Sequence, residues 1–263
     1  MHFTKMHGLG NDYLYVYGEV PGNIEKLSRK LSERHFGAGS DGMIYISQSD
    51  KADFKMRIFN ADGSEAMMCG NGIRCVGKYV YDKGYTDKTS LTVETLSGIK
   101  TLSLGLINEK VQSVTVDMGR AEVSEPAEVT VFGETISGIP VSVGNPHFVV
   151  FTEGVEGIAL EKLGPAIEHC GAFEGGVNVE FVQRISASHL RMRVWERGSG
   201  ITMACGTGAC AAAAAAVCSK RCSFLNPIRL ELDGGSLTIS VQPDFSVNMT
   251  GPAEFVYEGE TFE

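Results

Sequence analysis

The sequence predicts an α+β fold made of two similar halves with a seam between them. The main observation is a motif that occurs twice, at residues 56–72 and 192–208. Each copy reads as an apolar strand, a polar turn and the letters Cys-Gly-x-Gly at the start of a helix. The elements around the two copies follow the same order, and a chain of 263 residues has room for two such halves.

The two copies of the motif match residue by residue. When Cys69 is aligned with Cys205, the identical pairs are Met56 and Met192, Arg57 and Arg193, Met67 and Met203, Gly70 and Gly206, and Gly72 and Gly208. Because the identities cover both the strand and the start of the helix, we interpret the copies as the two halves of one reaction centre.

The first half shows alternating strand and helix patterns. Apolar residues at helical spacing predict one helix before the motif, and a second helix begins after Cys69 and ends near Gly84. Aromatic and β-branched runs predict the strands. The predicted strands are Tyr13–Tyr17, Met43–Ile46, Phe54–Phe59 and short hairpins between Ser90 and Asp117, and the first helix is Gly22–His35.

The second half repeats this plan. The residues Gly144–Phe151 resemble Gly10–Tyr17, a helix is predicted over Ile158–His169, and strands over Ile228–Leu232, Ser236–Val241 and Phe255–Tyr257. The helix after Cys205 is almost all alanine from Ala209 to Ala216. A helix that is apolar on every side is buried, so we expect this helix inside its half, wrapped by sheet.

Composition narrows the class of protein. A net charge of -9 argues against nucleic acid as the main partner, because phosphate backbones require clustered Lys and Arg. The longest apolar run, Ala209–Cys218, is far shorter than a membrane span, and we expect a cytoplasmic protein with no membrane partner. Seven cysteines do not suggest a secreted disulfide framework, so some thiols are available for chemistry.

The repeated cysteine suits proton transfer. A cysteine directly before a helix start faces unpaired backbone N–H groups and the positive end of the helix dipole, which favour the thiolate. The glycines leave those N–H groups open to a small carboxylate. Two such sites across a seam would invert a carbon beside a carboxylate: one thiolate removes a proton and the opposite thiol returns one. We expect no organic cofactor and no metal. The alternative is that Cys69 and Cys205 are small buried residues at helix starts.

The sequence resembles the diaminopimelate epimerase family. The motifs that carry the resemblance run in family order along nearly the whole chain: Gly8–Asp12, Phe59–Ser64, Met68–Cys75, Gly144–His147, Gly176–Val179, Glu196–Gly200 and Ala204–Cys210. The resemblance implies interconversion of LL- and meso-diaminopimelate without pyridoxal phosphate, in lysine and peptidoglycan precursor synthesis. It also implies two halves, each a sheet curled around a central helix: residues 1–117, to which a final strand at about 252–263 returns, and residues 118–251.

The same resemblance implies roles for individual residues. Cys69 and Cys205 are the acid/base pair, with His147 and Glu196 assisting. Glu196 and Arg197 would bind the α-amino group and the distal carboxylate. The remaining substrate ligands implied are Asn11, Gln48, Asn60, Asn145 and Asn178, with backbone amides of Gly70, Asn71, Gly206 and Thr207 holding the reacting carboxylate. One departure is Ile201, where many family members carry Glu.

Several of these residues have simpler readings. Asn11, Asn60 and Asn145 lie beside turn residues and could cap turns. Glu196 and Arg197 could form a surface ion pair. His147 could be a structural histidine, and Gln48 lies in a loop without a motif of its own.

Two other functions remain as alternatives. One is a sister cofactor-independent racemase of the proline or hydroxyproline type. The pattern of those enzymes at the first cysteine is Met-Cys-Gly-His, with His at the position where this chain has Asn71. The other is a thiol redox switch in which Cys69 and Cys205 pair reversibly. The sequence leaves the oligomeric state open, and a homodimer is one assembly compatible with it.

Overall fold

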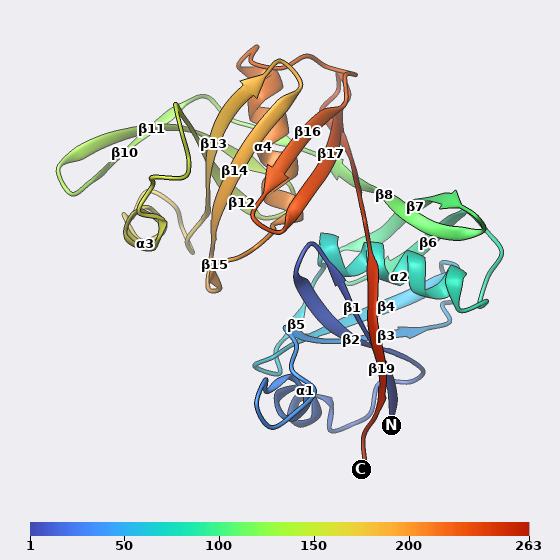
Figure 1. The fold of residues 1–263 in the computed structure, drawn as a ribbon. Helices are drawn as coiled ribbons and strands as arrows, with labels where there is room; N and C mark the ends of the chain where they lie inside the picture. Colours follow the sequence, from blue (N-terminus) through green and yellow to red (C-terminus); the bar gives the residue numbers. More distant parts are fainter. Residues whose placement is uncertain (263) are drawn as a thin grey trace. The chain divides into compact units, whose positions relative to one another are not determined.

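The computed structural model describes residues 1–262, and the chain forms two compact units (Figure 1). The first unit consists of Met1–Val116 and Gly251–Glu263, and the second of Asp117–Thr250. The chain leaves the first unit within strand β8 (Lys110–Arg120) and returns to it at the end of β18 (Ser246–Gly251).

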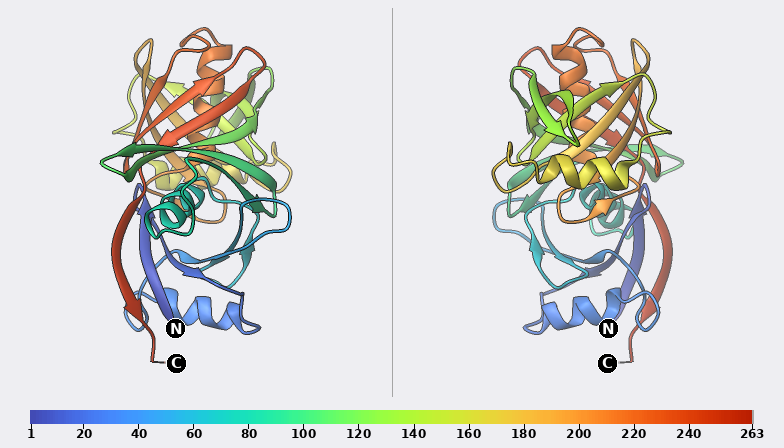
Figure 2. Two further views of the ribbon diagram at one scale, coloured as in Figure 1. Left: turned by 90° about the vertical axis from the view of Figure 1, so that its right-hand side faces the viewer. Right: turned by 90° about the vertical axis from the view of Figure 1, so that its left-hand side faces the viewer.

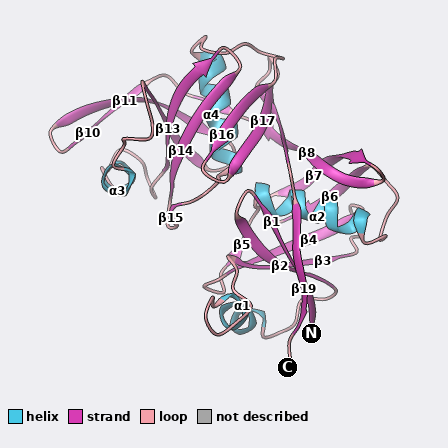
Figure 3. Ribbon diagram, in the orientation of Figure 1, coloured by secondary structure: helices cyan, strands magenta, loops and turns pink. Residues whose placement is uncertain are grey.

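The first unit contains two helices and a mixed sheet (Figure 3). The longer helix, α2, follows Cys69 directly, and the shorter, α1, lies between β2 and β3. In chain order the elements are β1 (His2–Gly8), β2 (Asn11–Tyr17), α1 (Ile24–Ser32), β3 (Gly42–Ser47), β4 (Phe54–Asn60), β5 (Glu65–Ala66), α2 (Gly70–Asp82), β6 (Ser90–Thr95), β7 (Gly98–Ile107), β8 and the returning β19 (Glu254–Glu260).

The second unit repeats this order. Its long helix, α4, follows Cys205 and has 13 residues, as α2 does. The elements are β9 (Glu122–Val123), β10 (Ala127–Val131), β11 (Glu134–Ser142), β12 (Pro146–Thr152), α3 (Leu160–Glu168), β13 (Asn178–Ser186), β14 (His189–Glu196), β15 (Gly200–Ile201), α4 (Gly206–Cys218), β16 (Ile228–Leu232), β17 (Gly235–Val241) and β18.

Strand pairing is the same in the two units. The parallel pairs β2–β3 and β4–β6 of the first unit correspond to the parallel pairs β12–β13 and β14–β16 of the second. The antiparallel pairs β1–β2, β3–β4 and β6–β7 correspond to β11–β12, β13–β14 and β16–β17. The predicted α+β class is therefore confirmed, with one topology used twice.

Both long helices lie against the concave side of their own sheet. α4 packs on β11, β12, β13, β16 and β17, and the alanines from Ala211 to Ala216 are fully buried. Figure 2 shows α4, in orange, among the strands of its unit in two views. α2 packs on β1, β2 and β7, where Gly77 lets the helix approach closely because a Cβ there would lie 2.9 Å from Leu102 Cδ2. Small residues thus allow each sheet to curl around its helix.

Several strands, β1 among them, had no counterpart among the predicted elements. The β10–β11 hairpin and β18 were not singled out, although Val129 and Val131 alternate with polar residues and Phe132-Gly133 supplies a turn with φ of 53° and 80°. The returning strand β19 is also longer than the predicted Phe255–Tyr257. Among residues 1–262, no helix has the length and apolarity needed to cross a membrane.

The packing of α4 leads to a stability prediction. We expect Ala213→Leu to lower the free energy of unfolding by about 1–3 kcal/mol, because the fully buried site has no room for three more carbons. Cys218→Leu is the matched control: it adds a leucine at the exposed end of the same helix and should leave stability within about 0.5 kcal/mol. Urea unfolding followed by circular dichroism measures both. Equal stability of the two variants would contradict tight packing around α4.

Candidate active site

In the first unit, Cys69 is the N-cap of α2. Its backbone is extended (φ -138°, ψ 116°), and the Gly72 N–H donates to its Sγ at 3.3 Å. The half-buried thiol donates in turn to Asn11 Oδ1, also at 3.3 Å. Gly72 leaves room for Ile44 at this turn, because a Cβ would lie 2.7 Å from Ile44 Cδ1. The Gly72 N–H and the Asn11 side chain therefore both help to hold the sulfur in place.

The orientation of Asn11 is set by an acidic neighbour. Asn11 Nδ2 donates to Asp41 Oδ2 at 2.8 Å, which leaves Oδ1 to face the thiol. Asp41 also accepts from the Asp12 N–H at 3.0 Å, and the Arg34 guanidinium bridges Asp41 and Asp12 at 2.9 and 3.1 Å. Asp41 and Arg34 were missed in the sequence because they act through Asn11, 30 residues away from Asp41.

The Tyr13 phenol lies beside Cys69 and Asn11. Burial raises the pKa of Tyr13 well above its usual range, and the nearby Cys69 and Asp41 add to the rise. The phenol therefore keeps its proton at physiological pH and can only act as a neutral hydroxyl.

In the second unit, Cys205 is the N-cap of α4 in the same way. Its backbone is extended (φ -113°, ψ 113°), and the Gly208 N–H donates to its Sγ at 3.3 Å. Thr207 Oγ1 lies 3.5 Å from the same sulfur. Cys205 is buried, whereas Cys69 is half-buried.

A buried hydrogen-bonded chain leads to Cys205. His147 Nε2 lies 3.0 Å from Asn145 Oδ1, and Asn145 Nδ2 donates to Thr207 Oγ1 at 3.3 Å. On its other side His147 Nδ1 lies 2.7 Å from Oε1 of Glu180, a carboxylate that the sequence had not pointed to. The structure thus brings Asn145, His147, Thr207 and Cys205 together.

The surroundings of Cys205 disfavour its charged form. Burial raises the pKa of the thiol well above its usual range, and the negative charges of Glu196 and then Glu180 raise it further. The thiolate expected from the helix dipole is therefore outweighed here, and Cys205 is a thiol at neutral pH. Burial also raises the pKa of Glu196, while hydrogen bonds from Thr202 and Cys205 oppose that rise. Glu196 is thus a hydrogen-bond partner of Cys205.

Asn178 braces Arg197. Asn178 Nδ2 donates to Pro146 O at 2.9 Å, and its Oδ1 accepts from the Arg197 N–H at 2.9 Å. The exposed Arg197 side chain donates to Gly175 O at 3.0 Å. Both polar atoms of Asn178 are therefore occupied by backbone, which fixes the loop that carries Arg197.

The remaining predicted residues of the first unit lie at different ends of their strands. Asn60, at the end of β4, pairs with Gly42 and donates to Ser64 Oγ at 3.0 Å. The Ala61 N–H donates to Asp41 O, so Asn60 and Asn11 lie at one end of the sheet. The exposed Gln48 follows Ser47 at the opposite end of β3. Gly70 and Asn71 form the first turn of α2, as Gly206 and Thr207 form that of α4.

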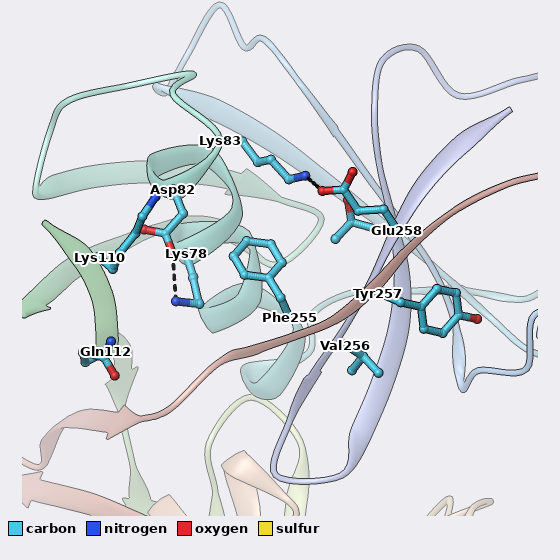
Figure 4. Close-up of a pocket in the computed structure, with 10 residues that line it drawn as sticks. Lys78, Asp82, Lys83, Lys110, Gln112, Phe255, Val256, Tyr257 and Glu258 are labelled. Carbon is cyan, nitrogen blue, oxygen red and sulfur yellow. Dashed lines mark hydrogen bonds and ion pairs between the residues drawn. The ribbon is translucent and has the colours of Figure 1, made fainter. Parts of the chain in front are cut away.

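A cavity of about 500 Å³ lies at the other end of α2 (Figure 4). Lys78 and Asp82 of α2 and the C-cap Lys83 line it together with Phe255 and Tyr257 of β19. Because a 13-residue helix is about 20 Å long, this cavity is remote from Cys69. Among residues 1–262, no group of three His, Cys, Asp or Glu side chains is arranged to hold a metal ion.

The family model for diaminopimelate epimerase matches residues 3–124 and 139–256. The chain belongs to the diaminopimelate epimerase family. A relative from Phocaeicola vulgatus named diaminopimelate epimerase is 50% identical over 98% of this chain and 97% of its own. One from Methanococcus maripaludis with the same name is 50% identical over 99% of both chains. The resemblance drawn from the motifs is confirmed.

Solved structures with this fold are distant in sequence. A hydroxyproline epimerase from Agrobacterium vitis has a TM-score of 0.76 at 16% identity and covers 99% of this chain and 90% of its own. A phenazine biosynthesis protein of the PhzF family from Bacillus anthracis has a TM-score of 0.79 at 16% identity, over 100% and 99%. At this identity they support the diaminopimelate epimerase fold alone, and neither the racemase nor the redox alternative gains support.

Proposed function

We propose that the protein is a diaminopimelate epimerase, an isomerase that interconverts LL- and meso-diaminopimelate in the cytoplasm, in lysine and peptidoglycan precursor synthesis. The relatives that share half of its residues carry that name. The observation that carries the mechanism is the duplicated cap: each cysteine Sγ accepts from the third amide of a 13-residue helix at 3.3 Å.

In the proposed mechanism Cys69 and Cys205 act on opposite faces of one α-carbon. The thiolate of one cysteine takes the α-proton, and the electron pair of the C–H bond passes into the adjacent carboxylate. The thiol of the other cysteine then gives its proton to the opposite face and is left as a thiolate. Backbone N–H groups of Gly70, Asn71, Gly206 and Thr207 would stabilise the charge on the carboxylate.

Glu196 and His147 assist the thiols in this proposal. Cys205 has a raised pKa, so it needs a proton acceptor to become a base, and the half-buried Glu196 lies next to it. His147 reaches Cys205 only through Asn145 and Thr207. Its contribution is therefore to the arrangement of those groups.

Asymmetric residues would select the substrate. Glu196 would bind the α-amino group and the exposed Arg197 the distal carboxylate, with Asn11, Asn60 and Asn145 as further ligands. Asn178 supports these ligands because its Oδ1 accepts a hydrogen bond from the Arg197 N–H at 2.9 Å. Gln48, at the opposite end of β3 from Asn60, has no part in it.

We also propose that the protein is a homodimer that buries strand β19. Phe255, Val256 and Tyr257 are 39%, 51% and 41% exposed, an apolar run on a strand at the surface of the first unit. These side chains line the cavity of Figure 4, and burying them against a second copy would remove that apolar area from water.

Val256→Asp should convert a dimer into a monomer of 28.3 kDa, because a carboxylate cannot be buried in an apolar contact without cost. Ile99→Asp is the matched control, since Ile99 on β7 of the same unit is also 51% exposed. Sedimentation velocity measures the mass of each. A monomeric wild type, or a dimeric Val256→Asp variant, would refute the proposed interface.

The proposed reaction is tested by incubating the enzyme with LL- or meso-diaminopimelate in heavy water. We expect epimerisation with deuterium at Cα, and a loss of about 10²–10⁴ in rate in both Cys69→Ala and Cys205→Ala. Cys218→Ala, at an exposed cysteine, should keep full activity. Chiral chromatography and NMR give the rates. Full activity in either of the first two variants would eliminate the two-thiol mechanism, and labelling of a different amino acid alone would reassign the substrate.

A further inference from the structure

Glu180 is a fully buried carboxylate near the start of strand β13. Its neighbours along the strand, Val179 and Phe181, are core residues. Its Oε1 lies 2.7 Å from His147 Nδ1, and within residues 1–262 its Oε2 has no hydrogen-bond partner. Burying a charge with only one partner is costly, so a purely structural role is a poor explanation for this glutamate.

The first turn of α4 leaves space for this carboxylate. A Cβ on Gly208 would lie 2.7 Å from Glu180 Oε1 and 3.2 Å from Cys205 Sγ. Only glycine therefore lets Glu180 and the Cys205 sulfur approach the same point of the helix. The second glycine of the Cys-Gly-x-Gly motif accommodates Glu180 in this unit, whereas Gly72 accommodates Ile44 in the other.

The contacts of His147 fix the direction of the hydrogen bonds that follow. His147 Nε2 faces Asn145 Oδ1, a pure acceptor, so Nε2 carries a hydrogen. Nδ1 is hydrogen-bonded to the Glu180 carboxylate. With its Oδ1 turned to His147, Asn145 must point its amide nitrogen at Thr207, and it donates to Oγ1.

The hydrogen bond from Asn145 then determines where the Thr207 hydroxyl hydrogen points. Since Oγ1 accepts from Asn145, the hydroxyl hydrogen is free to point at Cys205 Sγ, 3.5 Å away. We infer that Glu180 is a positioning residue that, through His147 and Asn145, turns the Thr207 hydroxyl toward Cys205 so that the thiolate receives a second hydrogen bond beside that of Gly208. This inference rests on the proposed role of Cys205 as an acid/base.

The charge of Glu180 and this chain act on Cys205 in opposite directions. As a charge, Glu180 raises the pKa of the Cys205 thiol, after burial and after Glu196. As the anchor of His147, it supplies a donor that favours the thiolate. The groups that face Cys205 are Glu196 from β14, Glu180 from β13, His147 from β12, and Thr207 with Gly208 from α4. If only the charge of Glu180 mattered, its removal would lower the pKa of the Cys205 thiol. If its role as the anchor of His147 dominates, its removal raises that pKa.

The test is the rate at which iodoacetamide alkylates Cys205 between pH 7 and 9.5, followed by peptide mass spectrometry, with Cys69 in the same sample as the reference. We expect Thr207→Val to slow alkylation of Cys205 about tenfold, the effect of one unit of thiol pKa. Glu180→Gln should also slow it, but by less, because loss of the Glu180 charge lowers the thiol pKa and offsets part of the loss of the hydrogen bond. The double variant should be no slower than either one, because both break the same chain.

Glu231→Gln is the matched control. Glu231 also pairs with a histidine of the second unit, His189 at 3.1 Å, but that pair is partly exposed and remote from the motif. Alkylation of Cys205 in this variant should match the wild type. Near-UV circular dichroism checks that each variant is folded, and Thr207→Val tests the chain even if Glu180→Gln does not fold.

Unchanged or faster alkylation of Cys205 in Glu180→Gln, or wild-type alkylation in Thr207→Val, would overturn the inference. So would equal slowing of Cys69 and Cys205 in Glu180→Gln. Because alkylation is read without substrate, the result is independent of whether the wild type epimerises diaminopimelate, and failure of that assay alone would count against the proposed function instead.

Discussion

The hydrogen bond from a backbone N–H to a cysteine sulfur at the start of a helix is the interaction on which the rest of the structure depends. It occurs twice with the same geometry, at Cys69 with Gly72 and at Cys205 with Gly208. An N-cap must have an extended backbone and an acceptor side chain, and both cysteines meet these conditions. A thiol is thereby fixed at the start of the long helix of each unit.

The two sulfurs nevertheless lie in different surroundings. Cys69 is half-buried and donates to Asn11, which Asp41 and Arg34 hold in place. Cys205 is buried between Glu196 and Glu180, and this raises the pKa of its thiol. One pattern of residues has thus produced two sites with different burial and different charged neighbours. A reaction that runs in both directions between unlike stereoisomers does not require the two sites to be equal.

Much of this arrangement could be predicted from the sequence, for a physical reason. Helix starts and strand patterns are local, so the duplicated Cys-Gly-x-Gly and the alanine run from Ala209 predicted both long helices, the burial of α4 and the family. The residues that orient the site, Asp41 and Glu180, could not be predicted from local sequence patterns. Asp41 acts on Asn11 and Glu180 acts on His147 across 30 and 33 residues, and only the pairing of parallel strands brings them together. A signal for Glu180 did exist, since Asn178 and Glu180 both interrupt the apolar residues between Val177 and Val182.

The central claim is that one thiol removes the proton and a different thiol supplies its replacement. The most direct measurement is the position of label when unlabelled LL-diaminopimelate is epimerised in heavy water and the reaction is stopped early. The account predicts deuterium at the inverted α-carbon of the meso product and none in the recovered LL substrate, because the thiol that took the proton is not the one that delivers the deuteron. Equal deuterium in recovered substrate and product would show a single base serving both faces and would contradict the account.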